Sequence, residues 1–266
     1  MIYGNVKVVK LIKDFIKEKR EEKNIVNKIL QDNIFELLEK DCELLYYPLE
    51  DDIKGIHMEK VVAGKTLQFV YINTDKKVEE QTWTAAHELG HVWKVEKYVY
   101  KNFPECDVDL ESIVNRFAAE LLMPEDEFLK AFEYAKRKIN FSAKVSLQEF
   151  IKIVAYLMNA FCVPYVAVIR RMVELEIVAK ENEEKYVSRF ADNLDKYRKE
   201  INENYYTKLD TTKKSCSMED ISLDLEMLEK SGIVTEKVIE RYRKAFNIEK
   251  KDETNEIFDV GGHDGN

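Results

Sequence analysis

The stretch His87-Glu88-Leu89-Gly90-His91 places two imidazoles four residues apart. In an α-helix, residues four apart lie above one another on the same face, so both rings can reach a single ion. Glu88 lies about 100° further round the helix, where its carboxylate can hold a water molecule on the ion rather than the ion itself. The stretch therefore predicts a metal-binding helix with the geometry of a zinc-dependent hydrolase.

The residues around this stretch support a helix over 79–94. Its apolar residues gather on the side opposite the two histidines, namely Ala85, Ala86, Leu89, Val92 and Trp93. Apolar packing does not account for the two histidines on the other face. The alternative to metal binding is that they are surface or capped histidines on a core helix. Gly90 costs about 1 kcal/mol in mid-helix, which is tolerable if another segment approaches the backbone closely.

A catalytic zinc usually has three protein ligands and one open position, so a third ligand is expected downstream. The two candidates, Glu111 and Glu120, are nine residues apart, about 900° of helical turn, and face opposite ways. Glu111 is the chosen ligand because Asn115, on the same face, can orient the second ring nitrogen of a ligating histidine. Glu120 is expected to be a solvated carboxylate on the outer face.

Two motifs, AHELGH at 86–91 and ESIVNRFAAELLMP at 111–124, resemble the ImmA/IrrE family of metallopeptidases. The resemblance covers roughly residues 30–178, and the second motif is the more specific one. Val114 departs from it, since the family commonly has Ala before the Asn. This change is expected to alter the packing of the two motif helices rather than the chemistry.

The resemblance implies a function and a set of roles. Members of the family are intracellular zinc proteases that cleave transcriptional repressors of phages, mobile elements or stress regulons. By that likeness Glu88 is the general base, and one Zn²⁺ per chain is bound by His87, His91 and Glu111. The implied partner is a protein substrate, a helix-turn-helix repressor encoded nearby.

The expected fold is α+β: a mainly helical, zincin-like (thermolysin-like) metallopeptidase domain with a small sheet beside the HExxH helix and a helical C-terminal extension. The first forty residues predict two amphipathic helices, and residues 44–75 predict the sheet, with its last strand at 67–73. This last strand leads into the metal helix, so it either offers its edge to a peptide or only supports that helix.

Further along the chain the signals are helical. Residues 161–175 have the shape of a helix-turn-helix, but so apolar a second helix favours packing over DNA reading. A long helix is expected over 180–206 and a helical pair over 221–246, around Ser231-Gly232. The predicted organisation is a metallopeptidase domain at 1–178, a helical accessory region at 179–249 and a loose tail at 250–266.

Composition limits the class of protein. With 266 residues, 45% of them hydrophobic, the chain can bury a substantial core. The N-terminus has no signal-peptide layout and the longest apolar run, 161–169, is too short to span a bilayer, which predicts a cytoplasmic protein without membrane contact. The four cysteines are scattered, so no disulfide framework is expected. The net charge of −9 argues against direct nucleic-acid binding.

Two other functions compete with proteolysis: a non-catalytic, metal-dependent regulator, and a DNA-bound regulator that uses residues 161–175. The presence of Glu88 counts against the first, because a sensor needs ligands but no general base. The acidic charge counts against the second. The sequence does not identify an oxyanion-stabilising group, although His57 is the only spare histidine ahead of the tail.

Overall fold

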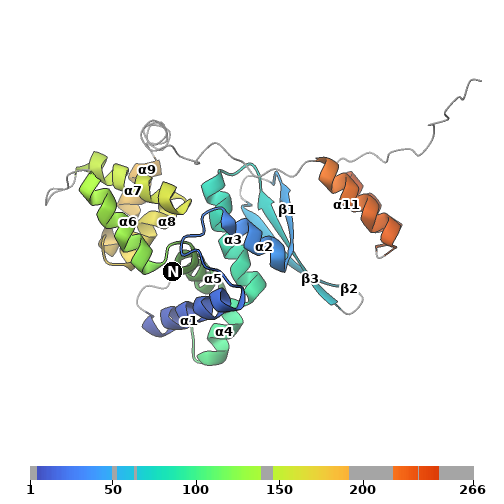
Figure 1. Cartoon of the computed structure of the whole chain (residues 1–266), viewed down its shortest axis with the longest axis horizontal. Helices are drawn as coiled ribbons and strands as arrows, with labels where there is room; N and C mark the ends of the chain where they lie inside the picture. Colours follow the sequence, from blue (N-terminus) through green and yellow to red (C-terminus); the bar gives the residue numbers. More distant parts are fainter. Residues whose placement is uncertain are drawn as a thin grey trace, which may run out of the picture. The chain divides into compact units, whose positions relative to one another are not determined.

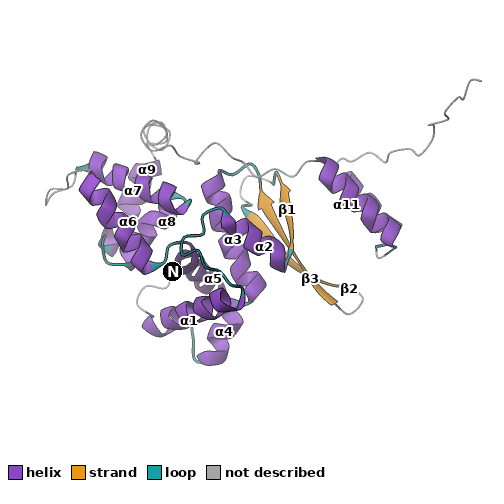
Figure 2. Cartoon of the chain, viewed as in Figure 1, coloured by secondary structure: helices purple, strands orange, loops and turns teal. Residues whose placement is uncertain are grey.

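The computed structural model describes residues 5–49, 53–62, 65–138, 146–191, 218–232 and 234–245. The chain divides into two compact units, Met1–Ser215 and Cys216–Asn266. The described part is mostly helical, with one small sheet in the first unit, as Figure 2 shows. The expected α+β class is confirmed.

Two helices precede the sheet, as predicted. Helix α1 (Val6–Glu22) begins at Asn5, whose side chain accepts a hydrogen bond from the backbone of Val8. Helix α2 (Asn33–Asp41) begins later than the apolar pattern indicates. The reason lies in the backbone: Asn24 and Gln31 both have positive φ, which is incompatible with a continuous helix across this segment.

The sheet has three strands, β1 (Glu43–Tyr47), β2 (Gly55–Val62) and β3 (Lys65–Asn73), in the order β1-β3-β2. Strand β3 runs parallel to β1 and antiparallel to β2. The strand expected at 67–73 is therefore central. Of its two alternative roles, offering an edge to a peptide is excluded because both of its edges are paired, and supporting the helix remains.

The helix that carries the predicted metal-binding histidines is α3 (Val78–Trp93), which packs on one face of the sheet in Figure 1. It is followed by α4 (Val95–Asn102) and α5 (Leu110–Leu122), and α5 packs against α3. The five apolar residues predicted for the inner face of α3 are all buried. The 3.6-residue period thus placed this helix correctly against the core.

The remaining helices of the first unit are α6 (Glu125–Lys138), α7 (Leu147–Phe161), α8 (Tyr165–Glu174), the 3₁₀ helix η1 (Lys180–Asn182) and α9 (Glu183–Ala191). Helix α7 begins with a capping box formed by Ser146 and Glu149. Most of α8 is buried, which agrees with a packing role for the helix-turn-helix-like segment.

Among the described helices, none is both long and apolar enough to cross a bilayer by itself. Helices α7 and α8 pass that test only when taken together, and they are bent by 102° at the break between them.

In the second unit, α11 (Met218–Ser231) and α12 (Glu236–Ala245) form the expected helical pair. Gly232 lies between them with φ of 63°, a left-handed conformation that favours glycine. Leu225 and Ile239 are buried. The long helix expected over 180–206 is seen as η1 and α9 as far as Ala191, and its remainder and the tail lie outside the described residues.

Candidate metal centre

Helices α3 and α5 bring His87, His91 and Glu111 together. Each of the three offers one ligand atom, and these atoms lie within 4.8 Å of one another. The Nε2 atoms of the two histidines are 3.1 Å apart. The carboxylate of Glu111 lies 3.3 Å from Nε2 of His87 and 3.7 Å from Nε2 of His91. The three residues chosen from helical spacing therefore converge on one point.

The spacing of these atoms fits a tetrahedral zinc ion. With zinc bonds of about 2.0–2.1 Å, neighbouring ligands of a tetrahedron are about 3.3 Å apart. Asn115 adds an independent sign, because its Oδ1 lies 3.1 Å from Nδ1 of His87. An amide oxygen accepts, so Nδ1 carries the proton and Nε2 presents its lone pair to the group. Two nitrogens and one carboxylate form a donor set typical of catalytic zinc.

Burial favours the neutral form of both imidazoles. Desolvation lowers the pKa of His91 to about 4, with a further contribution from His87 and opposition from Glu111. Desolvation also lowers the pKa of His87. Because the neutral ring is the form that binds metal, the site favours coordination. The side chain of Glu111 is 64% exposed, so the group opens to solvent on that side.

Glu88 lies beside the group, buried against β2. A Cβ atom on Gly55 would come within 3.1 Å of Glu88 Oε1 and would clash with Thr84, so only glycine leaves room for this carboxylate. Desolvation, followed by the charge of Glu111, raises the pKa of Glu88 to about 7. A carboxylate with a pKa near neutrality suits proton transfer near neutral pH.

Gly90 allows α5 to approach α3. A Cβ atom at this position would lie 2.9 Å from Cγ1 of Val114 and 3.0 Å from Cδ1 of Phe117. The sequence indicated that a mid-helix glycine here marks a close approach, and the α5 side chains supply it. Val114, the departure from the family pattern, is one of the two contacts.

Glu120 does face away from the metal group, but the expectation that it is solvated is wrong. It is only 4% exposed. Its carboxylate accepts hydrogen bonds from Arg171 at 2.8 and 2.9 Å and from Arg116 at 2.6 and 3.0 Å. Burial opposes its ionisation, but the charges of Arg171 and Arg116 outweigh this and lower the pKa of Glu120.

Glu174 completes this buried cluster. Its two oxygens lie 3.2 Å from Arg116 and 2.9 Å from Arg171. Arg171 also donates to the carbonyl of Met123, so the cluster joins α8 to the end of α5. Two arginines and two glutamates balance in charge, which makes their burial tolerable. The sequence offered no local sign of this arrangement.

One residue near the centre was not assigned a role from sequence. His57, on β2, stacks on His91 with ring centroids 5.9 Å apart. It lies thirty positions before His87 and on a strand, so helical spacing cannot find it. Only the register of β2 against β3 places it beside α3.

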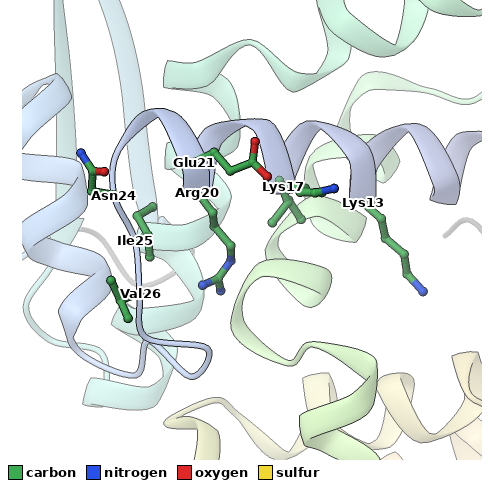
Figure 3. Close-up of a pocket in the computed structure, with 8 residues that line it drawn as sticks. Lys13, Lys17, Arg20, Glu21, Asn24, Ile25 and Val26 are labelled. Carbon is green, nitrogen blue, oxygen red and sulfur yellow. The ribbon is translucent and has the colours of Figure 1, made fainter.

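The surface hollow drawn in Figure 3 is separate from these residues. It runs along α1, and its lining includes Lys13, Lys17 and Arg20. Lys13 pairs with Glu125, and Arg20 donates to backbone carbonyls, including that of Leu121 at the end of α5. Lys13 and Arg20 therefore serve the fold.

This domain is zincin-like: it combines a small mixed sheet, a helix with two histidines and a glutamate between them, and a glutamate from a second helix. Residues 44–173 match the family model of the IrrE N-terminal-like domain, Peptidase_M78. The match covers both motifs, which confirms the resemblance seen in them. No curated protein matches the chain closely enough to add a named relative.

Proposed function

We propose that this protein is a zinc-dependent endopeptidase that hydrolyses a peptide bond in an intracellular protein, with a helix-turn-helix transcriptional repressor as its substrate. The observation that supports this most is the convergence of His87, His91 and Glu111 beside the buried carboxylate of Glu88. The family supports a peptidase; the metal, the endopeptidase activity and the repressor substrate are proposals.

The proposed roles follow from the positions of the side chains. Zinc, when bound by His87, His91 and Glu111, would acidify a coordinated water and polarise the scissile carbonyl. Glu88 accepts the proton of the attacking water and passes it to the leaving amine. Asn115 holds the ring of His87 so that Nε2 faces the site.

Strand β2 is the proposed platform for an extended substrate. In the described sheet, β2 is an edge strand that pairs with β3 on one side only. The backbone of Asn73 donates to the carbonyl of Lys54, and this fixes the alternation of the ladder. By that alternation Gly55, His57 and Glu59 direct their backbone groups to the free edge. A peptide strand added there passes beside the metal centre.

Metal content and cleavage test the proposal together. The purified parent is expected to hold about one zinc per chain, and Glu111→Ala is expected to bind it far more weakly. The exposed Glu105→Ala is the matched control and should retain parental zinc. Elemental analysis measures the zinc content, and chelator competition measures the zinc affinity.

Glu88→Gln separates the base from the ligands. It should retain zinc while cleavage of a helix-turn-helix repressor, followed by mass spectrometry of the fragments, falls by several orders of magnitude. Equal cleavage by Glu88→Gln, or no internal cleavage by the zinc-loaded parent, would contradict the endopeptidase assignment. The second result would favour a non-catalytic metal-dependent regulator.

A further inference from the structure

The two histidines of the metal centre are held differently. Asn115 fixes the ring of His87 by a hydrogen bond to Nδ1. Within the described part of the chain, Nδ1 of His91 has no such partner; its only hydrogen-bond contact is between its Nε2 and His87. A ligating imidazole normally has its other nitrogen fixed by a hydrogen bond, so the orientation of His91 must come from another contact.

His57 supplies that contact. Its ring lies almost parallel to that of His91, at 6° between planes and 5.9 Å between centroids. This is within the range of offset stacked aromatic pairs. Both rings are partly buried, and His57 is on β2 whereas His91 is on α3. The ring of His57, on β2, therefore packs against one face of the His91 ring, on α3.

His57 is itself anchored. Its Nε2 lies 3.1 Å from Oε1 of Gln68, and Nε2 of Gln68 donates to the carbonyl of Val92 at 3.4 Å. Val92 is among the last four residues of α3, whose carbonyls have no partner within the helix. The contacts thus run from His91 to His57 on β2, then to Gln68 on β3, and back to Val92, the residue after His91. Glu59 adds a second tie from β2, an ion pair with Lys94 at 2.8 Å.

These contacts also define the tautomer of His57. Because Gln68 uses its amide N–H for Val92, its oxygen faces His57 and accepts. Nε2 of His57 therefore carries a proton and donates it to Gln68. This N–H is therefore taken by Gln68 and is not free for an oxyanion. The geometry points to positioning rather than to transition-state hydrogen bonding.

We propose that His57 is a positioning residue that sets the ring plane of His91 for metal binding, with Gln68 as its anchor. This inference rests on the proposed function, since it takes His91 to be a metal ligand. It extends the metal centre from α3 and α5 to the β2–β3 hairpin, which is the same hairpin that offers the free edge to substrate.

The test compares zinc affinity in four variants by competition with a chromophoric chelator. His57→Ala removes the stack and is expected to bind zinc about 3- to 10-fold more weakly than the parent. His57→Phe retains a flat ring and should stay within about twofold of the parent. Gln68→Leu should fall between the two. Met58→Ala, on the exposed opposite face of the same strand, is the control and should match the parent.

A second readout is the visible spectrum of the Co²⁺-substituted protein, which reports ligand geometry without any turnover. It should change in His57→Ala and be preserved in His57→Phe. Parental affinity and spectrum in His57→Ala would overturn the positioning role while leaving the proposed function intact. Equal loss in His57→Phe and His57→Ala would overturn the stacking. If His57→Ala fails to fold, as judged by circular dichroism, the zinc affinities of His57→Phe and Gln68→Leu test the proposal instead. Weaker binding by Gln68→Leu than by His57→Phe supports it, and equal binding overturns it. A parent without zinc would instead refute the proposed function.

Discussion

Glu88 shows how a single side chain combines a chemical role with a cost to stability. It is only 7% exposed and lies against Gly55, where water cannot solvate its charge well. Burial raises the pKa of this carboxyl from an ordinary value near 4.5 to about 7. The folded protein therefore holds a proton on Glu88 at pH values where the unfolded chain has released it.

Linkage converts this difference into a prediction for the metal-free protein. A raised pKa stabilises the fold fully below pH 4.5, and this contribution is lost as pH rises through about 7. Glu88→Gln removes the titration, so at pH 8 the metal-free variant should be more stable than the parent by about 3 kcal/mol. At pH 4.5 the two should be nearly equal. Urea unfolding at both pH values measures this, and equal stability at pH 8 would contradict the assigned burial.

At the scale of elements, the α3–α5 contact brings Glu111 to the two histidines. The contact passes over Gly90, where a Cβ atom would meet Val114 at 2.9 Å and Phe117 at 3.0 Å. Both neighbours are fully buried, so neither can move freely. The glycine between Leu89 and His91 is thus required by the packing of the neighbouring helix.

A double-mutant cycle tests this contact. Gly90→Ala gains about 1 kcal/mol of helix propensity, but overpacking costs about 1–3 kcal/mol, so we expect a net loss of about 1 kcal/mol. In a Val114→Ala background Cγ1 is absent, and the loss should shrink or vanish. Urea unfolding of the four proteins gives the coupling. An additive cycle would mean that Val114 does not restrict Gly90.

Across the first unit, the buried cluster of Arg116, Glu120, Arg171 and Glu174 links distant parts of the chain. Glu120 and Arg171 are 51 residues apart in sequence, yet they form a two-fold hydrogen-bonded pair at 2.8 and 2.9 Å. The pair joins the C-terminal end of α5, whose first turn contains Glu111, to α8. Neutrality of the whole cluster depends on all four members.

Removing one member should therefore be costly. Arg171→Met leaves Glu120 and Glu174 buried with a single arginine, and we expect the free energy of unfolding to fall by about 3 kcal/mol. The adjacent Arg170→Met is the control, because Arg170 is half-exposed and its ion pair with Glu183 is worth less than about 1 kcal/mol. Thermal or urea unfolding of both variants measures the two losses in free energy of unfolding. Comparable losses would show that the cluster contributes no more than a surface pair.

The sequence by itself determined the parts of this protein that depend on periodicity within one element. Helical spacing placed His87 and His91 on one face, selected Glu111 over Glu120, and identified Gly90 as a point of close approach, since these relations are set by 3.6 residues per turn. The two motifs also identified the family. Each of these inferences needed only the local sequence of a helix or motif.

Tertiary structure decided what depends on contacts between distant segments. Periodicity showed that Glu120 faces away from the two histidines. Only the packing of α8 showed that its carboxylate contacts Arg171 rather than solvent. Likewise, sheet order made β3 central and left β2 at the edge, and strand register brought His57 to His91. A periodic pattern reports which side of an element is apolar; what lies against that side is set by long-range packing, whose partners the local sequence does not specify.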